Sequence, residues 1–464
     1  MAMKNRANAL FSCLLAVVAT VASTVSAADA KPTFTLHSQR KPGQTDRVGV
    51  LLEAGGETTY LDEGKRKCEK MSVVCRLEYD EKTLETPANA DGVWGDGVWR
   101  SVRDYQKAAV VVKVGEVEFK PEIHPQRRLI GAQFTEQTLT LFSPAGPLAR
   151  AELDAIDVPA DSLLLDGLLP EKPVAVGDHW RHSKKLLCAM LGLDEVAESD
   201  VESTLKEVTK VVARFELSGC VQGAIHGVST KIELKGKYRF DRRSKRIDWL
   251  GMLLKEERES SFVDDGVDAV SRLQITIKPT PVPESLAEAT LEKVALTPTE
   301  ALTRLAYESN DGWRCGFDRR WYRRNLAVFQ MIDRGEMLAQ CNISSLPRRD
   351  PEKLVSLEEF QADVRQALGE SFGSFIEASQ RVDPAGHRIL RVVAHGKSSD
   401  LPIRWVYYHV ADQQGRQAAL TFTVEQKLVE RFADADKPIV VSLRFVAPKE
   451  EKETRAGSAE KKGP

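Results

Sequence analysis

Strict alternation of apolar and polar residues is the most regular pattern in this chain. It is clearest in residues 231–240, "KIELKGKYRF", where Ile232, Leu234, Tyr238 and Phe240 share one side of an extended backbone. Such alternation predicts a half-buried antiparallel strand, and similar patterns before and after it predict a meander of about four strands. The apolar face of an open sheet must be covered by helices or by a ligand. The segments "SKKLLCAMLGL" and "SDVESTLKEV" are predicted to supply the covering helices.

Prolines mark the boundary between two predicted units. The segment "KPTPVPESLAEATLEK" begins with three prolines in six residues and continues with a helical pattern. We therefore expect a first unit at 31–283, a linker helix at 284–296 and a second unit at 297–447. The second unit opens on "TPTE", a capping box with proline at the first helical position, and then mixes helices and strands. The whole pattern predicts an α+β fold, with a large curved antiparallel sheet and covering helices followed by a smaller domain.

Both ends of the chain differ from these units. Lys4 and Arg6 precede the apolar run "ALFSCLLAVVATVA" and the small residues "STVSAADA", which is the layout of a cleaved secretory signal peptide. We assign it to residues 1–30 and expect a secreted or periplasmic protein. The apolar run is about 14 residues, shorter than a membrane span, so no transmembrane segment is expected. The charged segment 448–464 has no aromatic residues and predicts a disordered tail.

Six cysteines remain after the predicted signal peptide, an even number in an oxidising compartment. They are Cys68, Cys75, Cys188, Cys220, Cys315 and Cys341. Spacing favours disulfides between neighbours in sequence, Cys68 with Cys75 across a hairpin and Cys315 with Cys341 across two strands. Cys188 lies in a helical apolar stripe, where a buried free thiol is an ordinary core residue. The pairing of Cys188 and Cys220 is left open.

The segment "PVAVGDHWRH" concentrates residues that could hold a metal ion. If it is a strand, His179 and His182 point to opposite faces, and Asp178 lies roughly 13 Å from His182. Those positions cannot share one metal ion, so no metal is predicted. We interpret the segment structurally: Gly177 permits a tight turn, Asp178 bonds to the backbone, and Trp180 anchors the strand in the core.

Two groups of aromatic residues are candidates for ligand binding. "DGVWGDGVW" places Trp94 and Trp99 on a glycine-rich segment, which suits a ligand platform or a loop folded back on the domain. In the meander, Tyr238, Phe240 and Trp249 are expected on the apolar face of the sheet. A cavity there could take an acyl chain or an apolar segment of a partner.

Two resemblances extend this interpretation. "LLPEKPVAVGDHW" followed by a meander centred on "KYRFDRRSKRIDWLGMLLKEER" resembles a group of bacterial secreted proteins, whose sheet is similar to the half-barrel of periplasmic lipoprotein carriers (LolA-like). This resemblance implies a concave apolar face that holds acyl chains. The later run, from a G-H-R strand through a Y-Y-x-V hairpin to a strand ending in Arg-Phe, resembles the PsbP-like α/β/α sandwich. That resemblance implies binding or assembly rather than catalysis.

Net charge and short motifs narrow the range of possible functions. With 66 Lys and Arg against 68 Asp and Glu, the net charge of −2 gives no reason to expect nucleic acid as a partner. The short motifs of hydrolases, zinc proteases, phosphate loops and dinucleotide sites are absent from the sequence, and no cofactor is predicted. We expect an exported non-enzymatic protein that binds an apolar ligand, lipid or partner segment on its curved sheet. The alternatives are an envelope scaffold or interaction protein and a hydrolase with a dispersed catalytic site.

Overall fold

A computed structural model describes residues 31–62, 65–87, 97–136, 138–260, 265–324 and 327–446. The predicted signal peptide, Trp94 and the predicted C-terminal tail lie outside these residues. Within them strands dominate: the longest strand, β3 (Lys65–Glu85), has 21 residues, and the longest helix, α5 (Leu357–Leu368), has 12. The predicted α+β class is therefore wrong, and the fold is mostly β.

The first unit is built on one antiparallel sheet, which has 13 strands in the described part of the chain. Its strands are β2 (Thr45–Asp62), β3, β4 (Trp99–Val114), β5 (Val117–Phe119), β6 (Leu129–Thr135), β7 (Thr138–Phe142), β10 (His179–Arg181), β11 (Glu195–Ser199), β12 (Glu202–Val208), β13 (Val212–Ile225), β14 (Val228–Asp241), β15 (Arg246–Arg258) and β16 (Gly266–Pro279). The spatial order is β10-β12-β13-β14-β15-β16-β2-β3-β4-β6-β7, with β11 beside β13 and β5 beside β4. The short strands β1 (Thr33–Phe34) and β9 (Val174–Ala175) pair separately.

One segment predicted as a helix is a strand in the structure, which partly explains why the fold is mostly β and not α+β. "SDVESTLKEV" forms β12, in which Ser203 and Leu205 are buried while Thr204 and Glu202 are less so. Its buried positions therefore repeat every two residues, which is the period of a strand and not of a helix. "SKKLLCAMLGL" does form a helix, α2 (Lys184–Leu191), which begins after the capping residue Ser183.

The inner face of the large sheet is the face that carries Tyr238 and Phe240. It is covered by residues 150–174 and 183–193, which we call the plug: they contain α1 (Arg150–Ile156), the turn η2 (Leu165–Leu168) and α2. The plug and the sheet form one apolar core. The plug residues buried in that core are Leu153, Ala155, Ile156, Ala160, Leu163, Leu164, Leu165, Leu168, Leu169, Val174, Leu186, Leu187, Cys188, Met190, Leu191 and Leu193.

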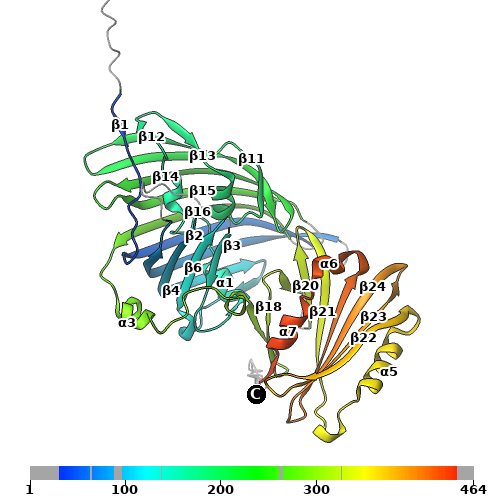
Figure 1. Ribbon diagram of the computed structural model, residues 1–464. Helices are drawn as coiled ribbons and strands as arrows, with labels where there is room; N and C mark the ends of the chain where they lie inside the picture. Colours follow the sequence, from blue (N-terminus) through cyan, green and yellow to red (C-terminus); the bar gives the residue numbers. More distant parts are fainter. Residues whose placement is uncertain are drawn as a thin grey trace, which may run out of the picture.

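The second unit is a smaller antiparallel sheet with helices on both faces. Its seven strands among the described residues are β19 (Trp321–Arg323), β20 (Val328–Asp333), β21 (Glu336–Leu346), β25 (Gln417–Glu425), β24 (Leu401–Ala411), β23 (Arg388–Ser398) and β22 (Phe372–Val382), in that spatial order. α5 packs on one face through Phe360 and Val364, while α7 (Asp436–Ser442) and α6 (Val429–Phe432) pack on the other. Figure 1 shows α5 and α7 on opposite sides of this sheet.

The two units are joined by more than the connecting chain. Segment 284–296 contains the turn η3 (Glu284–Leu286) and the short helix α3 (Glu288–Leu291), and α4 (Glu300–Thr303) follows it. A four-stranded sheet then joins β8 (Leu148–Ala149) of the first unit to β17 (Leu305–Glu308), β18 (Trp313–Phe317) and β26 (Arg444–Phe445). β8 and β17 run parallel to each other. Figure 1 shows the two units side by side, with α1 and β18 near their junction.

Candidate functional site

Tyr238 and Phe240, two of the predicted ligand-binding residues, lie on the inner face and are only 1% and 2% exposed. The phenol oxygen of Tyr238 donates a hydrogen bond to the backbone oxygen of Leu168 in the plug, at 2.8 Å. The ring of Tyr238 also stacks on Phe215, with the ring centroids 4.5 Å apart. Burial raises the pKa of Tyr238, so its hydroxyl stays neutral. Both side chains therefore pack against other residues of this protein.

Trp249, the third residue of that predicted group, lies on the opposite, outer face of the sheet. Its cross-strand neighbours are Arg239 on β14 and Thr276 on β16. The cause is a bulge in β15: Phe240 pairs with Ile247, but Arg239 pairs with Trp249, so one extra residue, Asp248, stands between them. An extra residue reverses the side on which later side chains emerge. Regular alternation would have placed Ile247 and Trp249 on the same face.

Around Trp249 the outer face is hollowed, with a volume of about 710 Å³. We call this the Trp249 hollow, and residues of β13 to β16 line it. They are Glu216, Leu217, Ser218, Lys235, Gly236, Lys237, Trp249, Gly251, Met252, Leu253, Arg272, Leu273 and Gln274. A Cβ atom at Gly251 would lie only 2.7 Å from Cη2 of Trp249, so the bare glycine lets the indole lie along β15. Leu253 is 51% exposed beyond it.

A second hollow of about 420 Å³ lies on the other side of Trp249, lined in part by residues of β12. Its charged groups are paired with one another. Lys206 contacts the carboxylate of Glu216 at 3.1 Å, and Arg239 contacts that of Asp248 at 2.8 Å. A hydrogen bond from Lys206 lowers the pKa of Glu216, which therefore remains ionised at neutral pH.

At the end of the Trp249 hollow around Leu253, the cations do not form ion pairs like those of the second hollow. Lys235 and Arg272 are exposed, and neither forms an ion pair with any residue that the structure describes. Glu53 is the neighbour of Arg272 on β2, but no ion pair joins the two. The Trp249 hollow thus combines an apolar floor with two cations at its rim that form no ion pair among the described residues.

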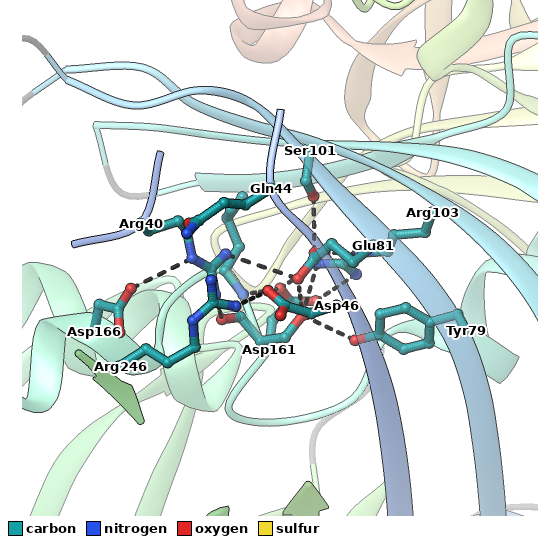
Figure 2. A network of polar contacts seen from close by, with 12 residues as sticks. Arg40, Gln44, Asp46, Tyr79, Glu81, Ser101, Arg103, Asp161, Asp166 and Arg246 are labelled. Carbon is teal, nitrogen blue, oxygen red and sulfur yellow. Dashed lines mark hydrogen bonds and ion pairs between the residues drawn. The ribbon is translucent and has the colours of Figure 1, made fainter. Parts of the chain in front are cut away.

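A buried polar network lies between the sheet and the plug, and Figure 2 shows its side chains pointing toward one another. At its centre Arg103 on β4 donates two hydrogen bonds to Asp161 of the plug, at 2.7 and 2.5 Å, and one to Glu81 on β3, at 2.8 Å. Ser101 and Ser162 donate to the two oxygens of the Glu81 carboxylate. Paired and hydrogen-bonded charges of this kind can persist without water.

The network extends to the N-terminal segment. Arg40 donates to the backbone oxygen of Ser162 at 3.0 Å and lies 3.4 Å from the carboxylate of Asp166. Arg246, at the start of β15, is paired with Asp46. Burial opposes the ionisation of Glu81, but Arg103 and Arg40 outweigh it and lower the pKa of this carboxyl. The network thus fastens the plug to the sheet and to residues 38–46, a structural role.

Sequence reasoning missed this network, although a signal was present. Glu81 continues the inward series of Leu77 and Tyr79 on β3, and Arg103 stands between the inward residues Ser101 and Tyr105 on β4. A charged residue at a position where alternation requires an apolar one indicates a buried charge. Two such positions on adjacent strands, with opposite charges, predict a buried pair.

The "PVAVGDHWRH" segment forms β9, a turn and β10. Gly177 has a positive φ of 99°, and the carboxylate of Asp178 accepts a hydrogen bond from the amide of Ala175 at 2.8 Å. The indole nitrogen of Trp180 donates to the backbone oxygen of Leu168 at 3.1 Å. His182 bonds to Ser203 at 2.8 Å. In the described part of the chain, no three His, Cys, Asp or Glu side chains are grouped as metal ligands.

Trp99 is buried at the start of β4, where its cross-strand neighbour is Phe134. Its indole is packed in the core of the first unit and does not reach the surface. Trp94, its proposed partner, lies outside the described residues.

The predicted disulfides are not formed, and the six described cysteines are free thiols. Cys68 and Cys75 lie on the same strand, β3, and not across a hairpin. Seven residues of extended chain separate them by roughly 23 Å, far beyond disulfide geometry. Cys315 and Cys341 are buried in one core, but β18 and β21 belong to different sheets. Burial raises the pKa of both thiols.

Comparison with known proteins gives matches among solved structures alone. No family model matches the chain, and no curated protein matches it. The solution structure of cyanobacterial PsbP from Synechocystis sp. PCC 6803 is similar over 31% of this chain and 92% of that chain, with 14% identity and a TM-score of 0.25. An outer membrane channel from Pseudomonas putida F1 is similar over 84% of this chain and 97% of that chain, with 7% identity and a TM-score of 0.14.

TM-scores this low carry no argument about function. The first similarity is a likeness to PsbP in part of the chain, and none of these similarities bears on the expected LolA-like half-barrel. Among the described residues, every helix is too short or too polar to cross a membrane.

Proposed function

We propose that this protein is an exported, non-enzymatic binding protein whose ligand or partner segment occupies the Trp249 hollow. The observation that carries the proposal is the contrast between the two faces of β14 and β15. The inner face, expected to hold an apolar ligand, is filled by the plug. The outer face has an open hollow lined by Trp249 and Leu253.

The chemistry of the hollow supports this proposal. Binding sites combine exposed apolar and aromatic surface with a few polar groups that fix orientation. Trp249 offers a large rigid surface, and tryptophan is enriched at the centres of interfaces. Leu253 extends that apolar surface toward Lys235 and Arg272. The N-terminal pattern of residues 1–30 supports export, because it has the charged, apolar and small-residue regions of a signal peptide.

An interaction or scaffold protein is the second candidate. It is favoured by β5, which is exposed along its length and carries Val117 and Phe119 at 66% and 50% exposure. Exposed apolar side chains on a short edge strand are suited to contact with another protein.

The experiment uses the folded mature chain and a panel of dodecyl amphiphiles with neutral, anionic and cationic headgroups, titrated calorimetrically below their micelle concentrations. We expect at least one to bind the wild type and to lose binding in Leu253→Asp, because a charge in the apolar floor must be desolvated. Ile376→Asp is the matched control, since Ile376 is equally exposed on β22 of the second unit. No binding by any amphiphile, or equal binding by Leu253→Asp, contradicts the proposed site.

A further inference from the structure

The arrangement of side chains in the Trp249 hollow gives information about the headgroup of its occupant. Leu253 pairs directly with Lys235 on β14 and with Arg272 on β16, so the exposed leucine stands between two cations in one row across three strands. Side chains in such a row are neighbours, with Cβ atoms about 5 Å apart. An anionic group above Leu253 would therefore lie within reach of both cations.

Away from these cations, the residues of β15 form a narrow apolar path between polar residues of β14 and β16. Lys237, Gly251 and Gln274 form the next row, and Arg239, Trp249 and Thr276 form the one after it. From Leu253 to Trp249 the path covers four residues, roughly 13 Å of strand. In the middle, the indole of Trp249 lies over Gly251, where a Cβ atom would be only 2.7 Å from Cη2 of the ring. The path is thus long enough for a medium-length alkyl chain lying along β15.

The local charges favour an anion at one end of this path only. Lys237 lies 3.5 Å from the carboxylate of Glu216, and Arg239 is paired with Asp248. These cations are already compensated. Lys235 and Arg272 have no such partner among the described residues, so an added anion there gains attraction without displacing an existing ion pair.

We propose that the occupant of the Trp249 hollow is a single-chain amphiphile with an anionic headgroup, which lies between Lys235 and Arg272 while its chain extends along β15 over the indole of Trp249. This inference rests on the proposed function and specifies its ligand class. It goes beyond that function because it assigns the headgroup charge and the direction of the bound chain.

The test compares dodecanoate, dodecyl maltoside and dodecyltrimethylammonium at concentrations below their micelle formation. Wild-type protein should bind dodecanoate most tightly. The double variant Lys235→Gln/Arg272→Gln should bind dodecanoate about tenfold more weakly, the loss expected for two partly exposed charge pairs, with its weak binding of dodecyl maltoside unchanged. Lys41→Gln/Lys293→Gln removes two exposed charges elsewhere and should bind like the wild type.

Fluorescence tests the direction of the chain. Dodecanoate should change the tryptophan emission of the wild type, and this change should be lost in Trp249→Phe but kept in Trp405→Phe, whose indole belongs to the second unit. Equal affinity for dodecanoate and dodecyl maltoside, or no effect of the double variant, overturns the anionic headgroup and leaves the proposed function standing. Tighter binding of an acidic peptide than of dodecanoate also overturns it. If none of these probes binds, both the anionic headgroup and the proposed function are overturned.

Discussion

The inner and outer faces of the large sheet are made by the same strands, yet they differ in nearly every physical respect. On the inner face of β14, Tyr238 and Phe240 pack against the plug, and the nearby charges are buried in a closed network. On the outer face of β15, Trp249 and Leu253 border a hollow, and the nearby charges are exposed.

The difference shows that the shape of a sheet does not by itself determine which face binds. A curved sheet offers its inner face to a ligand only if the chain leaves that face open, and here the plug occupies it. The outer face acquires its indole from two local features: the bulge at Asp248 turns Trp249 outward, and Gly251 leaves room for its ring along β15. Each can be altered separately from the core.

The largest expected effect is on the buried network. Arg103→Met should reduce the free energy of unfolding by about 3–5 kcal/mol, because it leaves Asp161 and Glu81 buried without their cation. Urea denaturation monitored by circular dichroism measures this loss. A loss below 1 kcal/mol would mean that the network does not fasten the plug and that the inner face is less closed than its contacts indicate.

Removal of an apolar plug residue should come next. Leu168→Ala should cost about 2–5 kcal/mol, because Leu168 is fully buried between the plug and the sheet and its truncation leaves a cavity. Leu253→Ala, the matched change on the outer face, should cost less than about 0.5 kcal/mol. The same urea experiment checks both, and equal losses would remove the distinction between the two faces.

Acid should lower the free energy of unfolding, and His182 on the inner face should contribute to this loss. Burial lowers the pKa of His182 to about 4, whereas the unfolded chain has an ordinary histidine. The unfolded state therefore takes up the proton first, so this contribution to stability is complete above about pH 6.5 and is lost as pH falls toward 4.

In His182→Gln, the acid-induced loss in the free energy of unfolding should be about 2 kcal/mol smaller than in the wild type. This figure is reduced to allow for partial exposure of the ring. Urea midpoints at pH 7 and pH 4 provide the measurement. His179→Gln is the control, because His179 is exposed on β10, just before His182, and its replacement should leave the wild-type acid response unchanged. An unchanged response in His182→Gln would contradict the assignment.

The smallest expected effect is on an outer ion pair. Arg239→Ala removes both hydrogen bonds to Asp248, yet it should change stability by only about 0–1 kcal/mol because the pair is exposed to solvent. Added salt should reduce even this difference. A loss comparable to that of Arg103→Met would show that the outer face contributes to stability as the inner face does.

The sequence predicted the regular parts of this structure well. Alternation in 231–240 identified β14 and the inward direction of Tyr238 and Phe240, and the apolar stripe of 184–191 identified α2. In both segments, local periodicity and tertiary burial select the same side chains. The mostly-β class was missed where the segment 199–208 was predicted to be a helix.

The candidate site could not be predicted in the same way. Trp249 was assigned to the wrong face because a bulge one residue before it is set by the pairing of two strands and leaves no clear mark in the sequence. Arg272 and Lys235 come together only through cross-strand register, from positions far apart in the chain. Leu253 did carry a local signal, since it is an apolar residue at an outward position.

The pairing of β8 with β17 has a consequence for the order in which the chain is assembled. Among the described residues, Leu148 and Ala149 have no strand partner in their own unit, and Leu305 and Ala306 supply one much later in synthesis. The first unit must therefore hold β8 in place before the small sheet that joins the units can close. Since long-range strand pairing is slow, this seam is expected to be the last part of the molecule to form.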